Sequence, residues 1–351
     1  MHSDQESIQH LKLMSREKPL SRRDFMRVLT AASAAGPGLA AAAFTGASLT
    51  KTQRADAAEL IVDGLGKISK ARYGTRHGDM MVSRMCICQD WNGELLAPAI
   101  EMGANFIHKA GYWGNVPEAI KKLPRESFYT DTTVDNTSPG HNPDDEEAAY
   151  RQVKESLDRN GLKYYDVFRA HYGWHNINSF NKGDNASYRA FKRLKREKLV
   201  RYFGVSQHPY PNVPNSDNTE RAEQYADMID AEVESGLVDS MQVWYSYGYP
   251  QAAKDAFARA SKAGIAMVAM KVWSFGHDKM RGDAAKIEEL KADGKVGRAL
   301  IREVMNEKRP DGKPIFCTCV SALGNMDVFE DNIGGVSPKV AMRDGFVPTL
   351  A

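Results

Sequence analysis

A histidine and a lysine stand side by side directly after a short apolar run, in the segment "ANFIHKAGYWG" at 104–114. The run at 105–107 is typical of a short buried strand, and the residues after it are typical of a loop at the strand's carboxyl end. In α/β proteins catalytic groups usually lie at that end. We therefore expect His108, Lys109 and the aromatic pair Tyr112 and Trp113 to belong to a functional site.

The elements that would position these residues repeat along the chain. Short apolar runs alternate with amphipathic segments such as 144–161, which begins with acids and ends at Asn160-Gly161, as a capped helix should. Strands are expected at 83–88, 105–108, 127–134, 164–171, 200–206, 240–246, 265–272 and 314–321. This alternation predicts a parallel sheet of the α/β class, and eight strands favour a closed (β/α)8 barrel. An open doubly wound sheet would show the same periodicity.

Composition limits the kinds of partner. The chain has 351 residues, a formal net charge of +2, 42% hydrophobic and 26% charged residues. These values are ordinary for a globular protein, and the near-neutral balance gives no reason to expect nucleic acid. We expect a small-molecule substrate, and the composition leaves the oligomeric state open.

The amino-terminal region resembles a twin-arginine export signal. Arg22 and Arg23 lie in "SRRDFM" and precede an alanine-rich apolar stretch at 28–47, which Gly36-Pro37-Gly38 makes a poor membrane span. Small residues at 55–57 suit cleavage. We therefore expect a signal and leader at 1–57, the barrel at 58–351, and a periplasmic or otherwise exported protein that crosses the membrane already folded. A plain leader or a retained anchor is the alternative.

Several segments resemble aldo-keto reductases, in the same order as in that family. They are "MVSRMCICQDW" (81–91), "GLKYYDVFRAH" (161–171), "EKLVRYFGVSQH" (197–208), "DSMQVWYS" (239–246), "AGIAMVAMKVW" (263–273) and "GNMDVFEDNIGG" (324–335). The resemblance implies a (β/α)8 TIM barrel with its site at the carboxyl-terminal mouth. It also implies hydride transfer between a nicotinamide cofactor and a carbonyl.

The catalytic residues that the resemblance implies are only partly present. The family's histidine, which orients the carbonyl, falls at His171. Its aspartate falls at His108 and its lysine at about Thr133. Its proton-donating tyrosine falls at Trp113, and an indole cannot donate and retake a proton as a phenol does. The resemblance therefore implies an oxidoreductase with an atypical site.

Two neighbouring residues offer replacements for the missing groups. Tyr112, one residue before Trp113, or a bound water would donate the proton, and Lys109 would supply the missing positive charge. A positive charge near a phenol matters because an unperturbed phenol donates poorly at neutral pH.

The resemblance implies a partial cofactor site. Its members are Ser206, Gln207 and Gln242 for the carboxamide, Lys271 on a later strand, and Asn332 for the adenine. No lysine or arginine stands in "SALGNMDV", where the family holds the 2′-phosphate, and Cys88 replaces a glycine. The cofactor is therefore NAD or NADP, with the choice open, and the chain could also bind no nicotinamide.

Two alternatives remain. His108 and His171 fall at positions that face one site in the family, and with Cys88 or Asp131 they could bind a transition metal. A non-catalytic binding protein would keep the fold alone.

The four cysteines form two pairs, Cys86 with Cys88 and Cys317 with Cys319, on the first and last expected strands. Because strand side chains alternate, each pair should share a face, and a closed barrel would make the two strands neighbours. A disulfide, a metal site or plain core packing would each fit.

Overall fold

The computed structural model describes residues 66–74, 76, 78, 80–90, 95–108, 116–135, 145–172, 186–207, 218–245, 249–272, 296–323 and 326–343. The expected signal and leader at 1–57 lie outside this part of the chain, as do Lys109, Tyr112 and Trp113. His171 is described in its backbone only.

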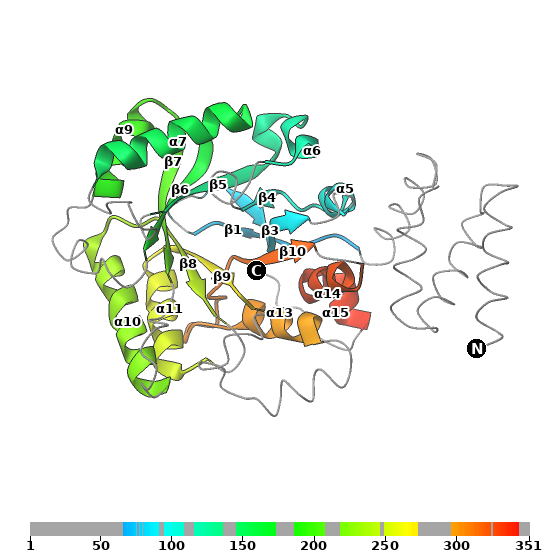
Figure 1. The fold of residues 1–351 in the computed structure, drawn as a ribbon. Helices are drawn as coiled ribbons and strands as arrows, with labels where there is room; N and C mark the ends of the chain where they lie inside the picture. Colours follow the sequence, from blue (N-terminus) through cyan, green and yellow to red (C-terminus); the bar gives the residue numbers. More distant parts are fainter. Residues whose placement is uncertain are drawn as a thin grey trace, which may run out of the picture.

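Eight parallel strands form a closed barrel (Figure 1). They are β3 (Met85–Asp90), β4 (Phe106–Ile107), β5 (Tyr129–Asp135), β6 (Tyr165–Tyr172), β7 (Val200–Gln207), β8 (Ser240–Trp244), β9 (Ala266–Met270) and β10 (Thr318–Leu323). The last strand, β10, pairs in parallel with both β3 and β9, and this pairing closes the sheet. All eight expected strands and the TIM barrel are thereby confirmed, and the open sheet is excluded.

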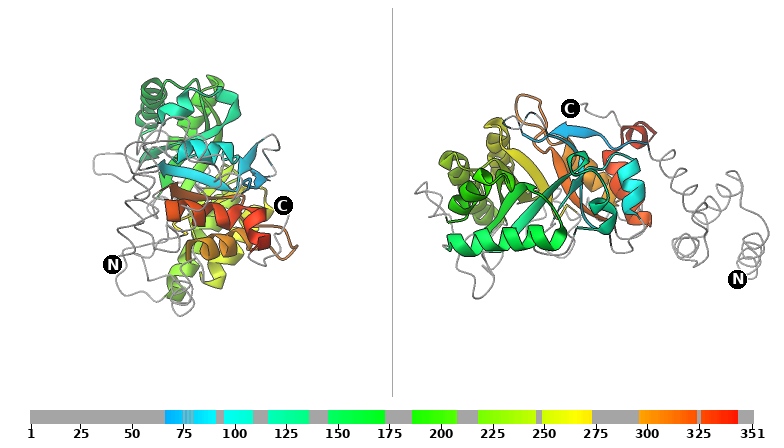
Figure 2. Two further views of the ribbon diagram at one scale, coloured as in Figure 1. Left: turned by 90° about the vertical axis from the view of Figure 1, so that its right-hand side faces the viewer. Right: turned by 90° about the horizontal axis from the view of Figure 1, so that it is seen from above.

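Helices surround the barrel (Figures 1 and 2). They are α5 (Leu96–Glu101), α6 (Glu118–Lys121), α7 (Glu146–Asn160), α9 (Ala186–Arg196), α10 (Asn218–Ser235), α11 (Gln251–Lys262), α13 (Val296–Asn306), α14 (Met326–Val336) and α15 (Pro338–Arg343), with a 3-10 turn at Arg125–Ser127. Among the described residues, no helix has both the length and the apolar character that a membrane span requires.

Local sequence explains α7. The Asp145 side chain accepts a hydrogen bond from the Ala148 backbone N–H and caps the first turn. Gly161, at a φ of 63°, ends the helix in the left-handed conformation that glycine tolerates best. Val153 and Leu157, four residues apart, turn the same face toward the barrel core.

A two-stranded hairpin that the sequence did not predict lies at the amino-terminal end of the barrel. Its strands are β1 (Lys70–Arg72) and β2 (Met81–Ser83). Tyr73 follows β1, is fully buried, and meets the Phe106 ring edge-on at a centroid distance of 5.5 Å. Its hydroxyl lies 2.5 Å from the Ser240 Oγ, at the first residue of β8. The hairpin thus supplies a side chain that fills the barrel interior.

The cysteines follow the expected pattern only in part, because β3 and β10 are neighbours as expected but Cys317 and Cys319 do not share a face. Cys86 and Cys317 belong to the barrel interior, whereas Cys319 packs in the core between strands and helices. The expectation that Cys317 and Cys319 share a face is wrong, because β10 begins at Thr318 and strand alternation does not extend back to Cys317. None of the four cysteines forms a disulfide. Burial raises the pKa of Cys317 to about 12 and that of Cys319 to about 11, so both stay protonated at neutral pH.

Candidate active site

His108 lies at the carboxyl end of β4 and contacts Asp131 of β5. The two strands pair at Phe106 with Tyr129 and at Ile107 with Thr130, so His108 comes level with Asp131. The imidazole Nδ1 lies 2.8 Å and 3.0 Å from the two carboxylate oxygens. Both side chains are buried, with His108 3% exposed. The neighbouring strand β5 therefore supplies a hydrogen-bond partner for the histidine.

Asp131 also contacts a buried arginine. The Arg169 Nε donates to Asp131 Oδ2 at 3.0 Å, and neither side chain reaches solvent. The guanidinium also donates to Ser240 Oγ and to the Tyr73 hydroxyl, each at 3.3 Å. Burial lowers the pKa of Arg169, but Tyr73 and Asp131 more than offset this and hold that pKa above its ordinary value. Asp131 and Arg169 thus form an ion pair inside the barrel.

Gly204 of β7 leaves room for this arginine. A Cβ at that position would lie 3.0 Å from the Val167 Cγ1 and 3.4 Å from the Arg169 Nη1. Its own backbone is not in the left-handed region, so the need for glycine here is one of space. The sequence gives no separate sign of this requirement.

The ion pair fixes the position of the proton on the neutral His108 ring. A carboxylate beside an arginine can only accept, so the imidazole Nδ1 donates to Asp131 and carries hydrogen. The other ring nitrogen, Nε2, then keeps its lone pair in the neutral imidazole. It lies 3.3 Å from the Gln242 Nε2, which donates toward it.

The side chain of Gln242, in β8, is only partly hydrogen-bonded within the part of the chain that the structure describes. Its amide nitrogen also lies 3.3 Å from the Met270 Sδ. Its Oε1 is buried and has no hydrogen-bond partner among the described residues. A buried acceptor that makes no hydrogen bond lowers the stability of the fold by about 1–3 kcal/mol. Such an oxygen is suited to accept a hydrogen bond from a bound amide.

Ser206 stands beside Gln242 in the sheet register. Its hydroxyl is buried, and its described contact is a weak one to the Met270 Sδ at 4.0 Å. The hydroxyl can donate and the Gln242 oxygen can accept. Together these two groups fit a carboxamide, which carries both a carbonyl oxygen and an NH2 group.

Gln207 does not join this pair. It is the next residue along β7 after Ser206 and therefore faces the opposite side of the sheet. Its amide donates to the Glu232 carboxyl of α10, outside the barrel interior. The structure thus separates Gln207 from Ser206 and Gln242, although the sequence grouped the three.

Glu232 is a polar group that sequence reasoning missed. It is fully buried, and burial raises its pKa well above the ordinary value, with the Gln207 hydrogen bond opposing this only in part. Its Oε2 has no hydrogen-bond partner among the described residues. The helical spacing of Tyr225, Ile229 and Glu232 places the glutamate on the apolar face of α10, and this pattern could have revealed it.

Comparison with known families decides the membership of the chain. The model described as "Aldo/keto reductase family" matches residues 90–298, more than half of the 351 residues. The chain belongs to the aldo/keto reductase family. Members of this family are typically NAD(P)H-dependent oxidoreductases.

Solved aldo-keto reductases share the barrel at low sequence identity. The holo form of an aldo-keto reductase from Bacillus halodurans is 17% identical, with a TM-score of 0.55, over 77% of this chain and 90% of that one. An aldo/keto reductase from Brucella melitensis is also 17% identical, with a TM-score of 0.51, over 77% and 93%. Comparison with curated proteins found no match.

The remaining residues expected in an aldo/keto reductase cofactor site lie on two further elements. Lys271 follows β9 with a φ of 58°, and its Nζ lies 4.4 Å from the centre of the Trp244 ring. A non-glycine residue in this left-handed region is uncommon and often marks a functional position. Asn332 is buried on α14, next to Asp331, which lies 3.9 Å from the Arg298 Nε.

The metal alternative gains no support from the described residues. Among them, no group of three or more histidine, cysteine, aspartate or glutamate side chains is placed to hold a metal ion. The His108 Nδ1 is engaged by Asp131. His171 lies in β6, paired in register with Asp135 and Ser206, but its side chain is outside the described set.

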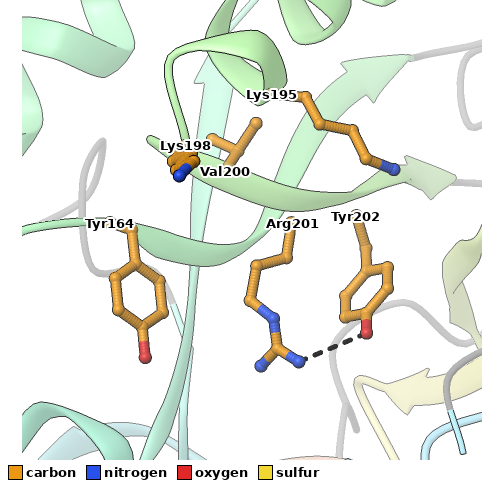
Figure 3. Close-up of a pocket in the computed structure, with 6 residues that line it drawn as sticks. All are labelled: Tyr164, Lys195, Lys198, Val200, Arg201 and Tyr202. Atoms are coloured by element: carbon orange, nitrogen blue, oxygen red, sulfur yellow. Dashed lines mark hydrogen bonds between the residues drawn. The ribbon is translucent and has the colours of Figure 1, made fainter.

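A shallow cavity of about 470 Å³ lies at the other end of the barrel (Figure 3). Its lining residues are Tyr164, Lys195, Lys198, Val200, Arg201 and Tyr202. They come from the amino ends of β6 and β7 and from the end of α9. The Arg201 cation is already paired with Asp166 at 2.9 Å. In TIM barrels this end usually serves stability and the opposite end catalysis, so the candidate active site remains the one around His108.

Proposed function

We propose that this aldo/keto reductase transfers hydride between a nicotinamide cofactor and a small carbonyl or alcohol at the carboxyl-terminal mouth of its barrel. The observation that carries the proposal is the buried Gln242 oxygen without a partner, beside the Ser206 hydroxyl. NAD and NADP both remain candidates, because the described residues do not reveal how a 2′-phosphate would be held.

Each residue of the site has a task that suits its chemistry. Ser206 and Gln242 hold the carboxamide, and Lys271, directly after β9, contacts the cofactor's phosphates. A bound nicotinamide supplies or accepts the hydride. His171 orients the substrate carbonyl, as the family resemblance implies. The accompanying proton comes from the stretch at and after the end of β4, where His108 and Tyr112 stand.

Replacing Gln242 with leucine is expected to weaken nicotinamide binding by about tenfold, the loss of roughly 1.4 kcal/mol from one hydrogen bond. Leucine keeps the volume near that of glutamine but cannot accept from a carboxamide. The measurement is the fluorescence titration of purified protein with NADH and with NADPH.

Thr318→Val is the matched control. The Thr318 Oγ1 is also buried without a hydrogen-bond partner among the described residues, but it lies at the amino end of β10. Wild type and Thr318→Val should bind the nicotinamide equally. Absence of binding in the wild type, or equal loss in both variants, would count against the proposed site.

Export is the second part of the proposal. The paired Arg22 and Arg23 before an apolar, glycine-interrupted stretch support a twin-arginine signal. That route carries folded proteins, which would let a tightly held nicotinamide cross with the chain. The protein isolated from the producing cells should begin near Ala58. A chain that keeps its first residues in the cytoplasm would refute export.

A further inference from the structure

A continuous chain of polar contacts runs through the barrel interior from the mouth toward the hairpin. It passes from Gln242 to His108, then to Asp131 and Arg169, and ends at Tyr73 and Ser240. The exposed fraction of each member is 3% or less. Polar groups buried this deeply are retained only where their partners are well placed.

Two charges within this series of polar contacts balance each other. Asp131 is the anion and Arg169 the cation. The neighbouring titratable groups Tyr73 after β1, Cys86 in β3 and Cys317 before β10 stay neutral. Burial raises the pKa of Tyr73 far above its ordinary value, and it raises the pKa of the Cys86 and Cys317 thiols as well. A proton added at the His108 Nε2 would therefore face a carboxylate held in place by an arginine.

We propose that His108 is the group that exchanges a proton with the substrate oxygen, and that Asp131 is its positioning residue. This inference rests on the proposed function and identifies the residue that supplies or accepts the proton accompanying hydride transfer. The Nδ1–H bond to Asp131 fixes the ring and directs Nε2 away from β5. Arg169 keeps Asp131 ionised, so the aspartate stabilises the imidazolium that forms.

In alcohol oxidation the O–H bond of the substrate breaks, and its proton forms an N–H bond at the His108 Nε2. The electron pair of that O–H bond becomes the second bond of the carbonyl. A bound oxidised nicotinamide would accept the hydride that leaves the carbon bearing this oxygen. In carbonyl reduction the imidazolium returns the proton to the oxygen.

The distance between the Gln242 amide and the His108 Nε2 indicates a weak contact that a substrate hydroxyl can replace. Gln242 donates toward the Nε2 over 3.3 Å, long for a hydrogen bond. The same amide has the Met270 Sδ as an alternative acceptor at an equal distance. A hydroxyl, which makes shorter bonds, can therefore take the place of the amide at Nε2.

The test combines kinetics with nuclear magnetic resonance. His108→Gln should lower kcat by about 10²- to 10⁴-fold, as the loss of a general acid–base group does. Tyr112→Phe, which removes the competing donor, should lower kcat less than His108→Gln does. Asp131→Asn should move the pH profile of kcat to lower pH, because the imidazolium loses its anionic partner.

Nitrogen-15 spectra of histidine-labelled protein give a readout that needs no activity. One of the nine histidines should show hydrogen on Nδ1, and its signal should vanish in His108→Gln and change in Asp131→Asn. Hydrogen on Nε2 of His108, or a Tyr112→Phe loss exceeding that of His108→Gln, would overturn the proposal. Wild type that shows this Nδ1 signal but transfers no hydride would instead overturn the proposed function and leave the His108–Asp131 pair supported.

Discussion

Replacing Asp131 with alanine is expected to lower the free energy of unfolding by about 3–5 kcal/mol. The substitution leaves the Arg169 guanidinium fully buried without its carboxylate, and it removes the acceptor of the His108 Nδ1–H. Tyr73 and Ser240 remain as partners of the arginine, but neither carries a charge that offsets it. Urea unfolding followed by circular dichroism measures the change.

A double replacement separates the charge from the packing. In Asp131→Leu combined with Arg169→Met both charges are gone and much of the volume stays, and such exchanges are often neutral or stabilising. The double variant should therefore be markedly more stable than Asp131→Ala. If Asp131→Ala unfolds within about 1 kcal/mol of the wild type, below the range typical of a broken buried pair, the buried ion pair does not exist as described.

Glu232→Gln is expected to become steadily more stable than the wild type as pH rises. Burial raises the pKa of Glu232 in the folded state above the ordinary 4.5. At pH values between the ordinary pKa and the raised pKa, the unfolded chain has lost the Glu232 proton and the folded chain still holds it. The free energy of unfolding of the wild type therefore falls as pH rises. The loss amounts to about 1.4 kcal/mol per pH unit across that window. Glutamine carries no such proton and removes the slope.

Glu234→Gln provides the control on the same helix. Glu234 is exposed on α10, two residues beyond Glu232, and its substitution should leave the pH dependence of unfolding unchanged. Unfolding curves recorded at increasing pH from about pH 5 upward, above the ordinary pKa of a glutamate, compare the three proteins. Parallel stability curves for Glu232→Gln and the wild type would show that Glu232 ionises in the folded state as it does in solution.

The sequence predicted the barrel well because the signal is repeated. Each of the eight strands is a short apolar run followed by an amphipathic helix, and small errors at strand ends do not alter that order. The hairpin of β1 and β2 escaped prediction because its strands have only three residues each, too few for a period of two to be recognised. Tyr73, a main contributor to the barrel interior, was missed with it.

The site could be predicted only in part because its contacts depend on register. His108 was recognised from its position after a strand, but its pairing with Asp131 follows from how β4 and β5 align. Arg169 meets Asp131 because the two positions face the same interior across β5 and β6. Gln207 was grouped with Ser206 by sequence proximity, and strand alternation places them on opposite faces.

The central claim is that the barrel transfers hydride from a nicotinamide. Purified protein can be incubated with NADH or NADPH deuterated at the transferable position of C4 and with a panel of small aldehydes and ketones. Mass spectrometry of the products then locates the label. The account predicts an alcohol with deuterium on its carbinol carbon. Nicotinamide binding without deuterium in any product, or no binding of either nicotinamide, would contradict it.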